Sequence, residues 1–521
     1  MDKYAKQALL EYNSAETAAH PGGVNGRNFW NLNSTQFTFA PTFQFPRAAI
    51  IVEQKYRYTA RDKNGKTYTF DSDSSMASLA PIWGELPTGV TTLKVEVIDK
   101  NDNPLFVIGA RTFFKCDPFP GREALPPKKL PYRECAIKSL EFVFNDPMVR
   151  HWLTHGLPQA DYPHNVYPAK TISSIILAMI AYSDFSPENA EQAIQLARNA
   201  ADYMLSLSFE EGHPMAYLPP TYSFENLDVE AVNKVAPAAW ECRNTNMMIY
   251  PVYASDAYLK LFDKTGDKKY FDAALRIAEF YRDNVLPCGS WYLVCDCETG
   301  KPLSDNICMD FRFVDFFRSL YEKTGNEEWQ KLELAHFNYI LGVCLKTYNW
   351  EGQFEDIKAS SNYTNLTHFT AGKIINYISN YRGDDENLVA EAKDLMRYIE
   401  DQFVVWGEYP VWDTNGENKI LHSPAGLEQY FCYWPIDAST STIISVFIDM
   451  YKLTKDRLYL EKAMALGDSY TRTQDDNGMV PTFWIGENCA EGRVNYWINC
   501  QIHGAFHMLK LADIIEQEGI E

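Results

Sequence analysis

The stretch that decides the fold is Leu261-Phe262-Asp263-Lys264-Thr265-Gly266-Asp267-Lys268-Lys269-Tyr270. Its apolar residue, threonine and aromatic residue recur with the same spacing at Leu320, Thr324 and Trp329, and again at Met450, Thr454 and Tyr459. The apolar residue closes one helix, the Thr-Gly or Thr-Lys corner turns the chain, and the aromatic residue begins the packing of the next helix. Three copies of one corner indicate a repeated helical hairpin.

Amphipathic helical patterns fill most of residues 133–517, and the breaks between them are of two kinds. Within a pair of helices the break is a few residues, whereas six connections are much longer: 146–167, 209–243, 286–307, 342–365, 405–435 and 475–497. Helices that alternate in direction bring all six long connections to one end of the molecule. We therefore predict a mainly α fold over residues 133–521, an (α/α)6 toroid of six hairpins around a central pocket. An open helical solenoid is the structural alternative.

Residues 37–115 follow a different pattern, in which short runs of β-forming residues alternate with turn signals such as Lys63-Asn64-Gly65. This spacing predicts an N-terminal β-sandwich domain, preceded by an extension over residues 1–36. A proline-rich linker over residues 116–132 then separates the sandwich from the toroid, which is the expected catalytic domain.

Composition excludes several classes of protein. The formal charge of -21, without a block of Lys or Arg, argues against a nucleic-acid partner, and no apolar run is long enough for a membrane span. Eleven cysteines lack the paired spacing of a metal site or disulfide scaffold, so we expect no metal and no cofactor. The first residues lack the apolar core of a signal peptide, which predicts a cytoplasmic protein, or a periplasmic one whose leader has been removed. The oligomeric state stays open, a homo-oligomer included.

The long connections are rich in tryptophan. They hold nine of the twelve: Trp152, Trp240, Trp291, Trp350, Trp406, Trp412, Trp434, Trp484 and Trp497. For any one of them, packing within its own loop is the simpler interpretation. As a set on a concave face they favour a glycan ligand, because the apolar face of a pyranose stacks on an aromatic ring while its hydroxyls meet polar groups.

Carboxylates lie among these aromatic residues, and we select Glu428, Glu355 and Asp356 as candidate catalytic groups. Burial against aromatic rings raises the pKa of a carboxyl group, as a general acid at neutral pH requires. A second, better solvated carboxylate can then act as base or nucleophile. The alternative is a structural role in loops or helix caps, and Asp437 fits an N-cap as well as it fits catalysis.

The helices that follow long connections should form the inner ring, with their N-termini directed at the pocket. Their first turns carry polar residues: Lys170, Arg243, Asn244, Asn246, Asp310, Arg312, His368, Asn499 and His503. Helix N-termini expose N–H groups and partial positive charge, so several of them around one cavity favour an anion. With Arg243 and Arg312 beside them, the carboxylate of a sugar acid becomes a candidate ligand. Each Arg taken alone also fits a structural pair with a nearby acid.

A β-sandwich followed by six helical hairpins resembles the six-hairpin glycosidase superfamily. The segments Pro219-Pro220-Thr221-Tyr222, Gln353-Phe354-Glu355-Asp356, Glu428-Gln429-Tyr430 and Trp497-Ile498-Asn499-Cys500 are similar to segments of bacterial polysaccharide-utilisation proteins. Among characterised groups the chain resembles glycoside hydrolase family 154, the exo-acting β-glucuronidases. The resemblance implies an α/α toroid and carbohydrate metabolism, and it identifies no catalytic residue by position.

The predicted function is a glycoside hydrolase that removes a terminal uronic acid, β-linked glucuronate, from an oligosaccharide. Glu428 would protonate the leaving oxygen, and Glu355 or Asp356 would activate water or attack the anomeric carbon. Arg243, Arg312 and His368 would hold the sugar carboxylate, and Tyr222, Tyr430, Trp434 and Trp484 would shape the subsite. The main alternative is a polysaccharide lyase with Tyr222, Tyr430 or His368 as base. A sugar epimerase and a non-catalytic glycan-binding protein are further alternatives.

Overall fold

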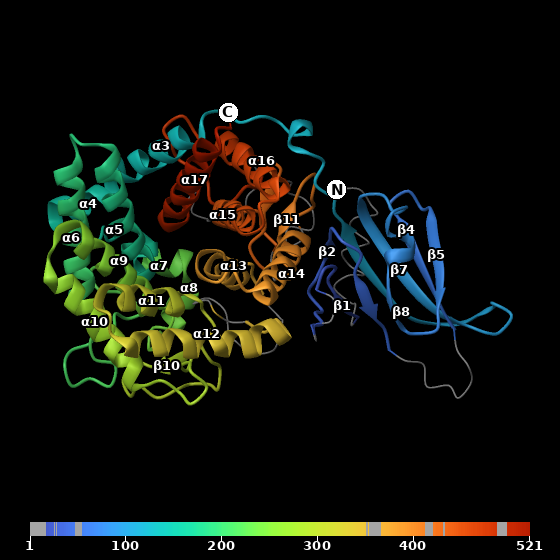
Figure 1. Cartoon of the computed structure of the whole chain (residues 1–521), viewed down its shortest axis with the longest axis horizontal. Helices are drawn as coiled ribbons and strands as arrows, with labels where there is room; N and C mark the ends of the chain where they lie inside the picture. Colours follow the sequence, from blue (N-terminus) through green and yellow to red (C-terminus); the bar gives the residue numbers. More distant parts are fainter. Residues whose placement is uncertain are drawn as a thin grey trace.

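The computed structural model describes residues 17–24, 27, 29–46, 55–350, 353, 366–411, 420–430, 433–486 and 497–520. A small β part near the N-terminus stands beside a larger helical ring (Figure 1). Among the described residues, no helix is both long enough and apolar enough to cross a membrane.

The ring has two layers of helices. The inner helices are α5 (Pro168–Phe185), α9 (Tyr250–Thr265), α11 (Arg312–Thr324), α13 (Phe369–Tyr381), α15 (Asp437–Thr454) and α17 (Ile498–Glu518). The outer helices are α3 (Tyr132–Asn145), α6 (Ala190–Ser206), α10 (Lys268–Asp283), α12 (Glu327–Thr347), α14 (Glu386–Phe403) and α16 (Arg457–Thr473). The last inner helix closes the ring, because Ile498 and Ile502 of α17 share one apolar core with Ile172 and Ile175 of α5. This closure confirms the predicted toroid and excludes the open solenoid.

The repeated corner has one structure in all three copies. The threonine hydroxyl donates to the carbonyl four residues earlier, at 2.6 Å for Thr265, 2.7 Å for Thr324 and 2.7 Å for Thr454. The following residue turns the chain with positive φ, 69° at Gly266, 66° at Gly325 and 59° at Lys455. An Asp or Asn then accepts from the backbone of the next helix, as Asp267 does from Lys269 at 3.2 Å. These short corners join an inner helix to an outer helix.

The long connections contain secondary structure of their own. Helix α4 (Pro147–His155) lies in the first connection, and α7 (Val229–Val235) and α8 (Pro237–Glu241) lie in the second. Strand β9 (Thr245–Met247) pairs antiparallel with β10 (Val294–Asp296). Because β9 occupies this segment, the predicted helix start near residue 244 is wrong, and α9 begins at Tyr250.

The β part consists of two sheets. Strands β2 (Gln36–Phe37), β8 (Pro104–Lys115), β7 (Gly89–Ile98), β4 (Lys55–Asp62) and β5 (Thr67–Ser72) form one sheet in that order, and β1 (Ala18–His20), β3 (Thr42–Gln44) and β6 (Met76–Ser78) form the other. The two sheets share a core in which the rings of Phe43 and Phe113 lie 5.5 Å apart. Sheets therefore occur over the predicted residues 37–115, and the predicted extension 1–36 adds strand β1. The sandwich and the domain boundaries stay predictions.

A buried carboxylate joins the β part to the ring. Asp401, near the end of α14, accepts hydrogen bonds from the backbone N–H groups of Thr38 at 2.8 Å and Phe39 at 2.6 Å. The neighbouring Gln402 donates to the carbonyl of Gln36 at 3.1 Å. Burial raises the pKa of Asp401 to about 7, against the lowering effect of these hydrogen bonds. The first strands are thus held on α14 by directed polar contacts.

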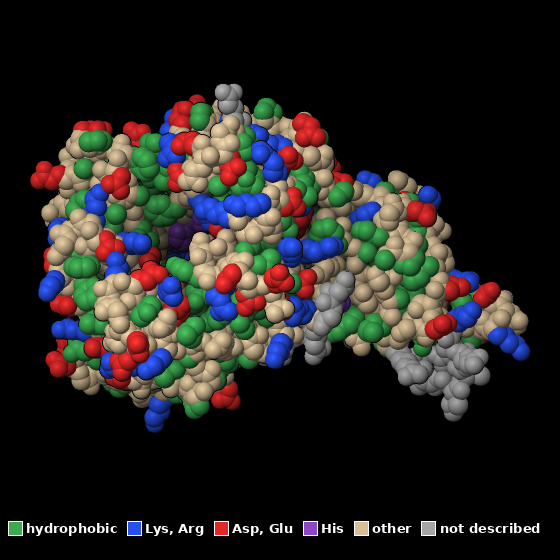
Figure 2. Space-filling model, in the orientation of Figure 1, with side chains coloured by type: hydrophobic (Ala, Val, Ile, Leu, Met, Phe, Trp, Pro, Cys, Tyr) green, Lys and Arg blue, Asp and Glu red, His purple; other side chains and the backbone are tan. Residues whose placement is uncertain are grey.

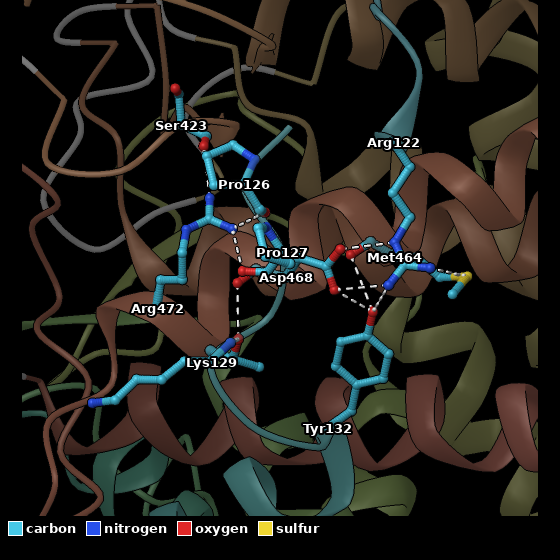
Figure 3. Close-up of polar contacts among 10 residues, drawn as sticks. Arg122, Pro126, Pro127, Lys129, Tyr132, Ser423, Met464, Asp468 and Arg472 are labelled. Carbon is cyan, nitrogen blue, oxygen red and sulfur yellow. Dashed lines mark hydrogen bonds and ion pairs between the residues drawn. The ribbon is translucent and has the colours of Figure 1, made fainter. Parts of the chain in front are cut away.

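The linker between the two parts is clamped onto the outer helix α16 (Figure 3). Arg122 Nε donates to Asp468 Oδ2 at 2.7 Å, and the hydroxyl of Tyr132 donates to Asp468 Oδ1 at 2.5 Å. One turn further along α16, the guanidinium of Arg472 donates to the carbonyl oxygens of Pro126 and Pro127. Because the Asp468 side chain is only 3% exposed, this carboxylate needs both partners.

Candidate active site

The first turns of the inner helices surround two adjoining cavities inside the ring. The loop-side cavity, about 100 Å³, lies where the long connections meet the helix starts, and its lining includes Trp350, Gln353, Thr367 and Glu428. The deep cavity, about 490 Å³, continues along the second and third turns of all six inner helices. Five residues line both: Tyr253, Arg312, Phe369, Lys373 and His503. Figure 2 shows a hollow in the ring with histidine side chains inside it.

Glu428 lines the loop-side cavity and is half-buried. Its backbone N–H donates to the carbonyl of Trp434 at 2.8 Å. Two residues earlier, strand β12 (Ala425–Gly426) pairs with β11 (Val404–Val405) at the end of α14. Gly426 lies so close to the start of α15 that an added Cβ would come within 2.6 Å of the backbone nitrogen of Thr440. The segment that carries Glu428 is therefore fixed on both sides.

Three cations line the loop-side cavity, namely Lys170, Arg312 and Lys373. The guanidinium of Arg312 pairs with Asp310 at 2.5 Å and lies over the ring of Tyr253, 3.9 Å from its centre. Lys170 lies 5.1 Å from the ring centre of Trp497. The only carboxylates among the described lining residues are Asp310 and Glu428, so the described part of the lining has a positive balance that suits an anionic ligand.

Aromatic side chains complete the wall of the loop-side cavity. Trp350 is buried, and its indole N–H donates to the carbonyl of Thr367 at 3.0 Å. Phe369 follows at the start of α13, and Tyr253 faces the cavity from α9. Burial raises the pKa of the Tyr253 hydroxyl, although the nearby Arg312 lowers it. Rings beside charged groups are the combination that a sugar acid requires.

Two histidines face the interior from α17. Burial lowers the pKa of His503 to about 3, and the positive charges of Arg312, Lys373 and Lys170 add to this effect. Burial also lowers the pKa of His507 well below its usual range, and its Nδ1 lies 3.2 Å from the hydroxyl of Ser441. Both imidazoles are therefore neutral at physiological pH and can accept or donate hydrogen bonds.

The structure brings only some of the predicted site residues together. Glu428 and Arg312 line the loop-side cavity, as do Lys170, Asp310, Asn499 and His503 from the predicted helix starts. Arg243 is exposed and lies over Trp240, 4.3 Å from its ring centre, outside the residues that line either cavity. Glu355 and Asp356 lie outside the described residues.

The remaining predicted side chains lie in the apolar cores. His368 is fully buried against Phe369 and Phe403, and burial lowers its pKa to about 3. The buried aromatic side chains predicted for the subsite are in the same situation: Tyr222, Tyr430, Trp434 and Trp484. Asp437 is buried in the first turn of α15, where its Oδ1 accepts from the N–H of Ala438 at 2.6 Å.

Sequence reasoning missed Tyr253 and Lys373, which lie one turn inside α9 and α13. It also missed the deeper groups Asp256, Asp315 and His507. What these five residues share is a position on the face of an inner helix that is turned away from the outer helices, where a polar residue could have been noticed. Within the described part of the chain, no group of three or more His, Cys, Asp or Glu side chains is arranged to hold a metal ion.

No protein-family model and no curated protein sequence matches this chain. Solved structures that resemble it include a cellobiose 2-epimerase from Spirochaeta thermophila DSM 6192, with 12% sequence identity and a TM-score of 0.50 over 74% of this chain and 98% of that one. A D-mannose isomerase is also similar, at 12% identity and a TM-score of 0.50 over 73% of this chain and 97% of that one. A family 76 glycoside hydrolase from a bovine Bacteroides thetaiotaomicron strain has 11% identity and a TM-score of 0.45 over 93% of this chain and 98% of that one. At these identities the likeness to the epimerase and the isomerase shows the fold, an α/α toroid of helical hairpins.

Proposed function

We propose that this protein is a glycan-processing enzyme, a glycoside hydrolase that removes a terminal β-linked uronic acid, glucuronate, from an oligosaccharide. The observation that supports this best is the loop-side cavity, where Arg312, Lys373 and Lys170 surround a site that also holds Glu428 and aromatic rings. A sugar carboxylate matches the cations, and the apolar face of its ring matches Trp350 or Tyr253.

Glu428 is the proposed general acid, because it is a carboxyl group on a long connection that lines this cavity and is half-buried there. Its proton passes to the glycosidic oxygen as the bond to the anomeric carbon breaks, and water supplies the hydroxyl that replaces the leaving group. Asp310, the other carboxylate in the described lining, is engaged by Arg312 at 2.5 Å and serves to hold that cation.

Glu355 or Asp356 remains the proposed second carboxylate. Gln353 lines the loop-side cavity, where its Oε1 accepts from the N–H of Met309 at 2.8 Å. Glu355 follows two residues along the chain, which spans at most about 7 Å. The place of Gln353 in the lining supports a carboxylate of this segment as the partner of Glu428.

The test is turnover of an aryl β-glucuronide and of uronic-acid oligosaccharides, with release of glucuronate as the readout. Glu428→Gln is expected to lower kcat/KM by about 10²–10⁴. The matched control is Glu408→Gln, which alters an exposed carboxylate on the same connection, away from both cavities, and keeps wild-type kcat/KM. Wild-type activity in Glu428→Gln, or in both Glu355→Gln and Asp356→Asn, contradicts these assignments.

A polysaccharide lyase is the second candidate, and one observation favours it. Tyr253 and the neutral His503 line the same cavity as Arg312 and Lys373, which places candidate bases beside cations that can neutralise a uronate carboxylate. A lyase releases an unsaturated product that absorbs short-wavelength ultraviolet light, and Tyr253→Phe then abolishes activity while Glu428→Gln retains it. A hydrolase gives no such absorbance, and Glu428→Gln then abolishes activity while Tyr253→Phe retains it.

A further inference from the structure

The space inside the ring continues past the loop-side cavity, where Glu428 lies, into the deep cavity. Along α11 the deep cavity extends from Arg312 to Ser319, seven residues that rise about 10 Å along a helix. Its volume of about 490 Å³ falls within the range of small-molecule sites. A ligand held at the loop-side cavity therefore has room to continue toward the interior of the ring.

Two cations of the deep cavity, Lys510 and Lys373, pair with carboxylates of the same cavity. Lys510 pairs with Asp449 at 2.6 Å, and Asn376 donates to the same carboxylate at 2.9 Å. Lys373 lies 3.7 Å from Asp315. With Asp256 and Arg312, the described lining holds three carboxylates and three cations beside the neutral His503 and His507. The described loop-side lining has three cations and two carboxylates, whereas the described deep lining has three of each, and Arg312 and Lys373 belong to both.

The remaining wall of the deep cavity suits hydroxyl groups and the face of a sugar ring. Ser319 of α11 and Thr442 of α15 supply hydroxyls, and Phe316 and Phe506 supply aromatic surface. Burial raises the pKa of Asp315 to about 6 and also raises that of Asp256, so this region disfavours a further negative charge. Paired charges, hydroxyls and rings match an uncharged polyhydroxylated ligand.

We infer that the deep cavity is a second sugar subsite, which binds a neutral hexose linked to the non-reducing side of the uronic acid. This inference rests on the proposed function, and it extends that function from release of a single uronic acid to release of a disaccharide. The scissile bond stays beside Glu428 in the loop-side cavity. The bond between the two sugars of the released product stays intact.

Two donors separate the subsites experimentally. One is an aryl β-glucuronide, which needs the loop-side cavity alone, and the other is the same compound with a neutral hexose on the non-reducing side of the glucuronate. Wild-type enzyme is expected to release the aryl group from the disaccharide donor with kcat/KM at least about tenfold higher, which corresponds to about 1.4 kcal/mol of additional transition-state binding. Chromatography of the products should show an intact disaccharide.

Ser319→Phe and Thr442→Phe each place a ring in the deep cavity, from different helices. Each is expected to lower kcat/KM for the disaccharide donor at least about tenfold and to leave the aryl glucuronide within about twofold. Ser319→Ala and Thr442→Val remove the hydroxyls without filling the cavity, and they separate the effect of lost space from that of a lost hydrogen bond. Circular dichroism and melting temperature check that each variant is folded.

The outcomes distinguish this inference from the proposed function. Turnover of both donors with equal kcat/KM, or an equal loss for both donors in the two Phe variants, overturns the second subsite and leaves the hydrolase intact. Turnover of the aryl glucuronide without turnover of the disaccharide donor also overturns the second subsite and leaves the hydrolase intact. Absence of turnover with both donors overturns the proposed function, and the disaccharide inference fails with it.

Discussion

The guanidinium carbon of Arg312 lies 3.9 Å from the ring centre of Tyr253. Nη1 of the same guanidinium contacts Oδ2 of Asp310 at 2.5 Å. The ring fixes the plane of the cation and the carboxylate fixes its direction, so the cavity receives a rigid cation rather than a flexible one. This arrangement is the best candidate for recognition of a sugar carboxylate.

Arg312→Lys is expected to lower kcat/KM for a uronide about 10- to 100-fold, mainly through KM. A lysine keeps the charge but loses the planar fork and the stack on Tyr253. Arg318→Lys is the matched control, because Arg318 also lies over a tyrosine, 4.9 Å from the ring centre of Tyr381, but lines neither cavity. Steady-state kinetics on the aryl glucuronide measures both. Equal kcat/KM for Arg312→Lys and Arg318→Lys would show that the geometry of Arg312 is irrelevant to recognition.

Asp315→Asn is expected to raise the free energy of unfolding, relative to wild type, more at pH 7.5 than at pH 4.5. Burial raises the pKa of Asp315 from 3.8 to about 6, so the folded state binds its proton more tightly than the unfolded chain does. The stability that it contributes is present below about pH 4 and is lost as the pH rises through about 6. The difference is on the order of 1 kcal/mol, since the carboxylate faces the cavity and water there weakens the effect of burial.

Urea unfolding at the two pH values measures this difference. Asp272→Asn, at an exposed position on α10, is the control and should change the free energy of unfolding equally at both. A pH-independent difference between Asp315→Asn and wild type excludes an elevated pKa at this carboxylate.

Asp468→Asn is expected to cost about 2–4 kcal/mol of unfolding free energy, because it leaves Arg122 without its buried anion and weakens the bond to Tyr132 (Figure 3). The control is Asp476→Asn, which alters a salt bridge to Lys129 whose carboxylate is 98% exposed. That change should stay within about 0.5 kcal/mol. Denaturant titration of both variants decides the matter, and similar losses would mean that the linker is not clamped at Asp468.

Gly426→Ala is expected to lower both stability and kcat. A Cβ at this position meets the backbone of Ser439 and Thr440 within 3 Å, so β12 must move away from α15 and shift Glu428 with it. Gly342→Ala is the control, since nothing lies within 4 Å of its added Cβ and it should stabilise α12 by about 0.5–1 kcal/mol. Melting temperature and aryl glucuronide turnover report the two effects. Full activity in Gly426→Ala would show that the position of Glu428 does not depend on this contact.

The ring itself could be predicted from the sequence, because helix periodicity and connection length are local signals. The corner at Thr265 and its copies fix the hairpins, and the long connections fix which helix ends meet. Arg312 and Glu428 were predicted for the same reason, since one begins an inner helix and the other lies on a long connection. The start of α9 could not be predicted, because the pairing of β9 with β10 is a contact between distant segments.

The aromatic part of the site was harder to predict. A tryptophan in a loop has the same sequence signature whether it faces the hollow, as Trp350 does, or fills a core, as Trp434 and Trp484 do. Tyr253 and Lys373 escaped notice for a different reason. A polar residue that faces a hollow within a ring has the same periodicity as one that faces bulk solvent.

All six long connections lead into the N-termini of inner helices, while the three short Thr corners lie at the C-terminal ends of α9, α11 and α15. Residues that keep the ring together and residues that choose a ligand are thus largely different sets. Exchange of a connection between relatives should redirect specificity without refolding the scaffold, which makes this chain a practical starting point for engineered ligand selectivity.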